Sequence, residues 1–434
     1  MHQLLERQAY RLAFWRVASD EINYRRFFDI NDLVGLCQEV PAVFGDSHRL
    51  VGRLIAEGKL QGLRLDHVDG LFDPAAYCRQ LRNLVTQKRN GAAGPFPIYV
   101  EKILAQHEHL PSWPVEGTTG YDFLALVNRL FVDPDGEAAI DEAYRRFAPG
   151  GSQGSAPGEA PPFERIALDC RHQIMDTLLS SELNVLAREL DRISEQHWKT
   201  RDYTVERLRL ALREIVASFP VYRTYVTRAG AGEDDRRHIH AAVARARRRW
   251  IGPDREMLDF IASVLTGDLV KGRSTGFNRN DVLRFAMRIQ QYTAPVMAKA
   301  IEDTAFYRFP RLLSLNEVGG DPQRFAVSPG AFHAANEERR RAWPHALLAT
   351  ATHDTKRGED ARIRIDVLSE IPAQWTQAVR RWRRFNRSRR VETDAGIAPR
   401  RVDEYMIYQA LLGAWPAALT RETCLLYTSD AADE

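Results

Sequence analysis

Cysteine is scarce in this sequence. The 434 residues include four, Cys37, Cys78, Cys170 and Cys424. Their spacing matches no metal-binding pattern, and no His-x-x-x-His pair with a nearby acidic residue occurs, so we expect no catalytic zinc ion. Scattered single cysteines are typical of proteins in a reducing compartment, and we therefore expect a cytoplasmic location.

Long apolar runs and an excess of one charge are also missing. No run is long enough to cross a bilayer, and the first seven residues lack the apolar centre of a signal peptide. The formal net charge of +3 is small for this length and gives no general argument for binding to nucleic acid or membranes. Hydrophobic residues at 44% and charged residues at 27% are ordinary for a globular protein, and 434 residues predict more than one domain.

One stretch combines a strand pattern with a pair of opposite charges. In residues 62–70, Leu63 and Leu65 alternate with Arg64 and Asp66, which is the period of two expected of a strand. Arg64 and Asp66 therefore share a face, and the guanidinium favours the ionised form of the carboxyl group. An ionised carboxylate where a strand meets a loop suits a nucleophile. The alternative is a surface ion pair at a strand end.

Two more acidic residues follow predicted strands. Residues 95–100 predict a strand that ends at Glu101, and residues 347–352 predict a short strand that ends before Asp354. A helix beginning near residues 73–74 separates the first two strands, an order that predicts parallel strands with crossovers. In a β/α barrel all such strand ends lie on one face. For each acid taken alone, the alternative is a helix N-cap.

Three acids at one face would suit cleavage of a glycosidic bond. Two carboxyl groups about 5 to 5.5 Å apart are enough for a retaining mechanism. One attacks the anomeric carbon, and the other protonates the leaving oxygen and later deprotonates the acceptor. A third can stabilise the oxocarbenium-like state.

The rest of the chain divides by composition. Residues 147–163 are rich in Gly, Pro and Ser and predict a flexible linker or loop, whereas residues 164–218 and 234–265 show helical spacing of apolar residues. We interpret the basic run at 245–249 as a solvated helix face, with a nucleic-acid patch as the alternative. Interleaved aromatic and arginine side chains at 8–30 suit packing, a sugar groove or base stacking, and packing is the default.

Several blocks resemble a known family. Gly-Leu-Arg-Leu-Asp-His (62–67), Tyr-Val-Glu-Lys-Ile-Leu (99–104) and Ala-Thr-His-Asp-Thr-Lys-Arg-Gly-Glu-Asp (351–360) resemble regions of the α-amylase superfamily, glycoside hydrolase family 13. Four more resemble its maltooligosyltrehalose synthase branch, at residues 22–33, 117–123, 302–308 and 315–322. The resemblance extends from about residue 8 to 423.

This resemblance implies the fold class and the domains. We expect an α/β protein, a partial TIM (β/α)8 barrel that lacks its early strands and carries a large helical insertion. The superfamily's first motif, with an Asn-His pair, is absent. The expected segments are the first part of the barrel (1–134), the helical insertion (135–290) and the return part of the barrel (291–423). Residues 424–434 resemble a translated sequencing-library adapter, and we expect a fragment of a longer enzyme.

The resemblance also implies roles for individual residues. Asp66 would be the nucleophile, Glu101 the general acid/base and Asp354 the stabiliser of the transition state. Arg64 would orient Asp66 and keep it ionised, and His353 would hydrogen-bond the sugar at the cleavage subsite. The remaining expected substrate contacts, on the acceptor side, are His67, Asp69, Lys299, Lys356 and Arg357.

The implied reaction converts the reducing-end α-1,4 linkage of a maltooligosaccharide into an α,α-1,1 linkage, as in trehalose biosynthesis. It needs no metal or other cofactor. The expected partners are the α-1,4-glucan substrate and, in the same pathway, a maltooligosyltrehalose trehalohydrolase, with no nucleic acid and no membrane. The alternatives are an α-glucan hydrolase of the α-amylase type, a non-catalytic glucan-binding protein, and an RNA-binding protein that uses the arginine and aromatic segments.

Overall fold

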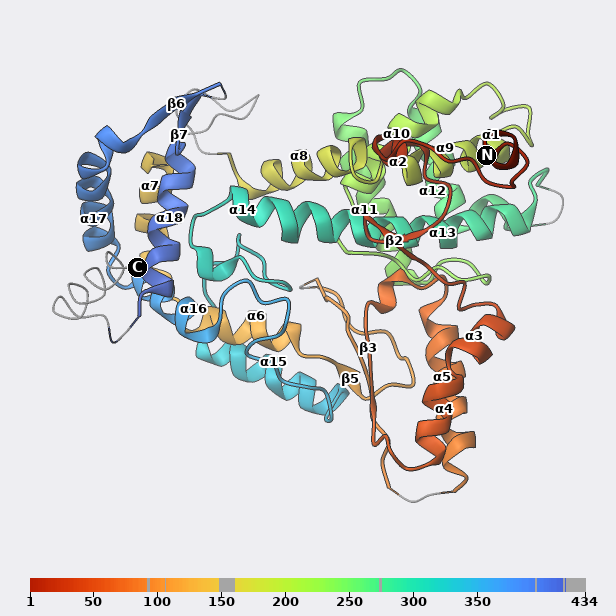
Figure 1. Cartoon of the computed structure of the whole chain (residues 1–434), viewed down its shortest axis with the longest axis horizontal. Coiled ribbons are helices and arrows are strands. Elements are labelled where there is room, and N and C mark those ends of the chain that lie inside the picture. Colours follow the sequence, from red (N-terminus) through yellow and green to blue (C-terminus); the bar gives the residue numbers. More distant parts are fainter. Residues whose placement is uncertain are drawn as a thin grey trace. The chain divides into compact units, whose positions relative to one another are not determined.

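The computed structural model describes residues 1–91, 94–105, 107–147, 161–272, 275–394, 396–416 and 418. Most of the predicted linker and the whole adapter-like tail lie outside these residues. The described part is an α/β protein of mostly helical content (Figure 1). It contains no helix long and apolar enough to span a membrane.

The chain forms two compact units. The first comprises residues 1–119, 167–304 and 345–347, and the second comprises 120–166, 305–344 and 348–434. These divisions fall elsewhere than the predicted segment limits at 134 and 290, which stay predictions. Every secondary-structure element described between residues 137 and 297 is a helix.

The first unit holds a small parallel sheet. Strands β3 (Leu63–Leu65), β4 (Ile98–Val100) and β5 (Gly117–Thr118) lie in the order β3-β4-β5, and both pairs are parallel. Helix α5 (Pro74–Arg89) connects β3 to β4, which confirms the predicted crossover. Asp73 caps this helix by accepting a hydrogen bond from the Ala76 amide, and Pro74 occupies its first position.

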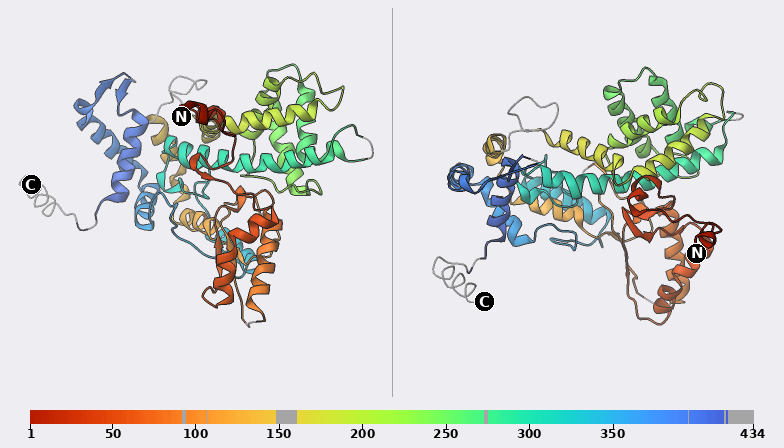
Figure 2. Two further views of the ribbon diagram at one scale, coloured as in Figure 1. Left: turned by 45° about the vertical axis from the view of Figure 1, so that its right-hand side comes forward. Right: turned by 45° about the horizontal axis from the view of Figure 1, so that its top comes forward.

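Helices make up most of the rest of the first unit, which also holds the short antiparallel pair β1 and β2. Helices α9 to α13 pack against one another and bury apolar stripes such as Leu183, Leu186 and Leu190 of α9 (Figures 1 and 2). A π-helical turn, Ala298–Ala305, follows α13 directly. The elements of this unit besides the sheet and α5 are α1 (His2–Leu5), α2 (Ala18–Glu21), β1 (Arg26–Phe27), β2 (Ile30–Val34), α3 (Pro41–Ser47), α4 (Arg49–Ala56), most of α8 (Phe163–Asp176), α9 (Ser180–Ser194), α10 (Val205–Ala217), α11 (Glu233–Arg249), α12 (Arg255–Thr266) and α13 (Arg279–Met297).

The second unit is helical apart from one hairpin. Its core gathers Tyr144, Phe309 and Tyr405, whose rings contact one another edge-on or tilted. Its elements are α6 (Tyr121–Leu130), α7 (Glu137–Phe147), α14 (Phe306–Arg308), α15 (Pro329–Ala342), α16 (Glu359–Asp366), α17 (Pro372–Phe385), the hairpin of β6 (Val391–Thr393) and β7 (Gly396–Ala398), and α18 (Arg401–Ala414).

One predicted strand is wrong. Residues 347–352 form no strand, although the Leu347 amide donates one hydrogen bond to the Thr118 carbonyl at 3.1 Å. A strand needs a ladder of such bonds with a neighbour, and a single bond does not make one. Leu347 and Leu348 are also exposed, so their apolar character does not report a buried strand.

Candidate active site

Two carboxyl groups meet at the ends of β3 and β4. Leu65 and Val100 are paired in the parallel ladder, so Asp66 and Glu101, the next residues, hold equivalent positions on adjacent strands. The Glu101 amide donates a hydrogen bond to the Leu65 carbonyl at 2.8 Å and continues the ladder. The side chains of Asp66 and Glu101 lie within hydrogen-bonding reach of each other. The structure therefore brings together the predicted nucleophile and the predicted acid/base.

Arg64 keeps Asp66 ionised, as predicted from their spacing. Its Nη1 lies 2.6 Å from Oδ1 of Asp66. Partial burial raises the pKa of the Asp66 carboxyl, but the hydrogen bond and charge of Arg64, together with the hydrogen bond from Glu101, bring that pKa below its ordinary value. A low pKa keeps the Asp66 carboxyl ionised at neutral pH, which is the state that a nucleophile needs.

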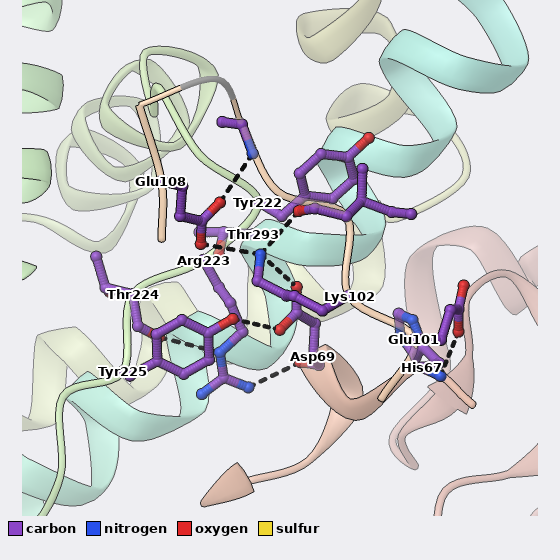
Figure 3. Close-up of polar contacts among 12 residues, drawn as sticks. His67, Asp69, Glu101, Lys102, Glu108, Tyr222, Arg223, Thr224, Tyr225 and Thr293 are labelled. Carbon is purple, nitrogen blue, oxygen red and sulfur yellow. Dashed lines mark hydrogen bonds and ion pairs between the residues drawn. The ribbon is translucent and has the colours of Figure 1, made fainter. Parts of the chain in front are cut away.

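His67 connects the two strand ends through its backbone. It has a φ of 45°, a left-handed conformation that is uncommon outside glycine, and its amide donates to Oε2 of Glu101 (Figure 3). Its ring packs on Phe27 and Phe28, with centroids 5.5 and 4.4 Å away. Burial lowers the pKa of the imidazole, which favours a neutral ring.

Asp69 is turned into the protein. It is 6% exposed, and its Oδ1 accepts a hydrogen bond from the Tyr225 hydroxyl at 2.6 Å while Oδ2 lies 3.3 Å from the ammonium of Lys102 (Figure 3). Both carboxylate oxygens thus have partners inside the protein, and the sugar contact of Asp69 stays a prediction. The carboxylate links the loop after β3 to Tyr225 and Lys102.

Lys299 lies on the π-helical turn of the first unit. Its ammonium is 3.1 Å from the carboxylates of both Asp29 and Asp303 and sits 5.3 Å from the centre of the Phe28 ring. Burial lowers the pKa of this lysine, but the two carboxylates raise it above the ordinary value, so the side chain stays charged. Phe28 thus contacts both Lys299 and His67, two of the predicted substrate-binding residues.

The predicted third carboxylate, Asp354, belongs to the second unit. Its Oδ2 accepts a hydrogen bond from the Tyr121 hydroxyl, at the start of α6, and lies 3.6 Å from Nε2 of the exposed His353. Tyr121 is buried and therefore fixes the direction of the carboxylate. Instead of ending a strand, Asp354 sits in a turn.

A buried glutamate shapes that turn. Glu317 accepts hydrogen bonds from the amides of Lys356 and Arg357 at 2.7 and 2.9 Å. The Lys356 ammonium lies 5.0 Å from the centre of the Tyr307 ring, and burial lowers the pKa of the Arg357 guanidinium. The second unit thus brings together the predicted residues His353, Asp354, Lys356 and Arg357.

Helix α16 supports the same turn through buried charges. Arg362 donates to the carbonyl oxygens of Thr350 and Arg357, and so holds both ends of the turn. Asp366, one helical turn further on, is 1% exposed, and the buried Ser314 hydroxyl lies close enough to lower the pKa of its carboxyl. Burial outweighs this effect and raises the pKa from 3.8 to about 7.

The raised pKa of Asp366 predicts a pH-dependent stability. A carboxyl whose folded-state pKa is raised stabilises the fold at low pH, and this contribution disappears as the pH rises from about 4 to about 7. We expect Asp366→Asn to remove this loss and to stabilise the chain at pH 8 by about 1 to 4 kcal/mol relative to the parent. Thermal unfolding of both proteins at pH 5 and pH 8 measures it. Equal differences at the two pH values would contradict the assignment.

No metal site is apparent in the described part of the chain, where no group of three or more His, Cys, Asp or Glu side chains is arranged to hold an ion.

The sequence reasoning missed residues that support the site from behind. The sole signal for Lys102 was its place directly after Glu101, whereas nothing in the sequence connected positions 222–225 or 317 with the strand ends. The missed residues are Lys102, Glu108, Tyr121, Tyr222, Arg223, Tyr225 and Glu317.

An aspartate with a lowered pKa and a glutamate at the ends of adjacent parallel strands define an α/β protein with a pair of carboxyl groups at its strand ends. No protein-family model matches the chain. Its relatives include proteins of two Mycobacterium tuberculosis strains that carry the name maltooligosyl trehalose synthase, 36% identical over 426 residues. The match covers 95% of this chain and 47% of each relative.

Solved structures agree with these relatives. Maltooligosyltrehalose synthase from Arthrobacter ramosus is 36% identical with a TM-score of 0.78, and the match covers 99% of this chain and 49% of that one. The corresponding Sulfolobus tokodaii protein, titled a maltooligosyl trehalose synthase, is 30% identical with a TM-score of 0.72, covering 99% and 49%. The chain is thus a relative of the maltooligosyltrehalose synthases and spans about half of their length.

Proposed function

We propose that this chain carries the reaction centre of an intramolecular transglucosylation that forms maltooligosyltrehalose from a maltooligosaccharide. The observation that carries the proposal is the placement of Asp66 and Glu101 at the ends of the paired strands β3 and β4, where Arg64 lowers the pKa of Asp66 against the effect of burial. An ionised Asp66 beside Glu101 would supply the nucleophile and the acid/base that a retaining double displacement needs.

In the first half of the reaction, an oxygen of Asp66 attacks the anomeric carbon of the penultimate glucose. The bond to the reducing-end glucose breaks, and Glu101 transfers its proton to the leaving oxygen. We propose that Asp354, oriented by Tyr121, stabilises the positive charge that develops on the sugar, and that His353 contacts the sugar at this position. These roles follow the family resemblance of residues 351–360.

In the second half, the released glucose turns so that its anomeric hydroxyl faces the glycosyl-enzyme. Glu101 takes the proton of this hydroxyl, whose oxygen displaces Asp66 from the anomeric carbon. The configuration is retained and no water is consumed, so the net reaction is an isomerisation. Hydrogen-bond donors that hold the free glucose raise the chance that it reacts before water does, and we assign this role to Lys299, Lys356 and Arg357.

We also propose a β/α barrel fold, a partner enzyme in the pathway and a cytoplasmic location. Three adjacent parallel strands with a helical crossover support a β/α barrel of which β3, β4 and β5 form a part. The proposed reaction implies a trehalohydrolase that acts on its product. The free cysteines Cys37, Cys78 and Cys170 support a cytoplasmic location.

Incubation of the chain with maltopentaose tests the function. We expect reducing ends to disappear with little release of glucose, because the reducing-end anomeric carbon becomes locked in an α,α-1,1 linkage. A reducing-sugar assay and an enzymatic glucose assay on the same samples measure both quantities. Glucose or shorter oligosaccharides as main products would favour the hydrolase alternative, and binding without conversion would favour the glucan-binding alternative.

A further inference from the structure

We propose that Lys102 is a positioning residue that sets the separation of Asp66 and Glu101, an inference that rests on the proposed function. Lys102 follows Glu101 directly, just beyond the end of β4, and successive side chains of an extended chain point to opposite sides. Figure 3 shows this arrangement, with Glu101 directed toward His67 and the Lys102 ammonium directed away from it. The chain that carries the acid/base is thus anchored from behind by its next residue.

The anchor uses every donor that lysine has. The Lys102 side chain is fully buried, and its ammonium lies 2.8 Å from the Ile103 carbonyl, 2.9 Å from Oε1 of Glu108 and 3.3 Å from Oδ2 of Asp69. An ammonium has three N–H donors, so these three acceptors saturate it. Burial lowers the pKa of Lys102, but the two carboxylates raise it above its ordinary value, so the group remains a cation.

The two carboxylates come from different loops. Asp69 lies three residues after Asp66, in the loop after β3, and Glu108 lies seven residues after Glu101, in the loop after β4. Glu108 also accepts the Ala105 amide at 3.0 Å and thereby closes its own loop. One ammonium therefore ties together the two loops that begin at the reacting carboxyl groups.

Arg223 completes the anchor on the side of Asp69. Its Nη1 donates to the carbonyl oxygens of Asp69 and Leu71 at 2.7 and 2.6 Å, and its guanidinium lies over the Tyr225 ring. Two buried cations thus face two buried carboxylates, and their formal charges balance. Each group is held by the others, so a change at Lys102 will move the loops rather than only one side chain.

The position of the anchor matters because reactivity of the pair depends on its geometry. A displacement of about 1 Å between reacting groups can cost about 100-fold in rate. The Lys102 ammonium binds Ile103, Asp69 and Glu108, so its effect on the two reacting carboxyl groups acts through the backbone of the two loops. Rate should therefore fall more than substrate affinity.

The test is a charge-balanced double variant, Lys102→Met with Glu108→Gln. It removes one cation and one anion, so the formal charge of the cluster is unchanged. The matched control is Arg82→Met with Glu116→Gln. Arg82 bonds Glu116 at 2.7 Å and the Phe96 carbonyl at 2.8 Å, and so makes a similar link ahead of β4, at the opposite end of the strand from Glu101.

We expect the Lys102→Met/Glu108→Gln variant to retain its fold, judged by circular dichroism, and to lose about 100-fold in kcat with less than a threefold change in KM. The Arg82→Met/Glu116→Gln control should keep kcat within about threefold of the parent. Glu108→Gln alone, which keeps the lysine, should lower kcat about tenfold. This single variant replaces the double variant as the test if the double variant does not fold. Unchanged kcat in the folded Lys102 variant overturns the inference.

A second measurement separates this inference from the proposed function. Carboxyl-carbon NMR of labelled aspartate follows the titration of Asp66 whether or not maltopentaose is converted. We expect its pKa to rise toward the ordinary value in the Lys102→Met/Glu108→Gln variant and to stay unchanged in the control. If the parent converts no substrate but this shift occurs, the function proposal fails and the positioning role stands. If Asp66 titrates identically in all three proteins, the positioning role fails.

Discussion

Asp66→Asn is expected to lower kcat for maltopentaose by about 10,000-fold, which corresponds to about 5 kcal/mol of transition-state stabilisation. An amide oxygen is a poor nucleophile, so the glycosyl-enzyme cannot form at a useful rate. The hydrogen bond with Arg64 can persist, because the amide oxygen still accepts from the guanidinium at this position. The measurement is loss of reducing ends at saturating substrate.

Asp73→Asn is the control for this change. Asp73 lies in the same loop between β3 and α5, and its side chain caps the helix. Asparagine caps a helix about as well as aspartate, so both stability and kcat should remain near those of the parent. A fall in kcat of less than about tenfold for Asp66→Asn would remove it from the reaction and with it the double displacement.

Glu101→Gln is expected to lower kcat for maltopentaose by about 1,000-fold to 10,000-fold, because glutamine cannot donate the proton that the leaving sugar oxygen needs. With α-maltosyl fluoride the loss should be far smaller in the first step, since fluoride leaves without protonation. Release of fluoride and loss of reducing ends, measured on the same variant, separate the two steps.

The comparison needs a variant that makes the same chemical change elsewhere in the sheet. Glu116→Gln does so, because Glu116 binds Arg82 and the Ile98 amide at the start of β4 and is remote from Asp66 along the strand. It should keep kcat with both substrates. If Glu101→Gln were equally slow with the fluoride, its role as acid would be refuted and a general structural effect would be the better explanation.

The local features of the fold were predictable where short-range chemistry decides them. The alternation at 63–66 predicts β3 and places Arg64 beside Asp66, and Asp73-Pro74 predicts the start of α5. Both are confirmed because a strand face and a helix cap depend on residues two to four positions apart. The run at 347–352 has the same apolar character but forms no strand, since a strand also needs a partner that no local pattern can supply.

Some features of the candidate site could likewise be predicted from the sequence, and others could not. Pairing of Asp66 with Glu101 follows from the parallel register of β3 and β4, and could be anticipated from two acids at two strand ends. Burial of Asp69 could not, because its partners Lys102 and Tyr225 lie 33 and 156 positions further along the chain. Tyr121, which orients Asp354 from 233 positions away, was likewise beyond sequence reasoning.

By itself the amino-acid sequence determined which residues carry reactive groups and which of them end a strand. It did so because side-chain chemistry and the period of a strand are properties of neighbouring residues. The tertiary structure alone decided which acid is partly exposed at the end of its strand and which is buried. Asp66 and Asp69 are three residues apart and chemically identical, and they differ because one faces Arg64 and Glu101 while the other faces a buried lysine and two distant elements of the chain.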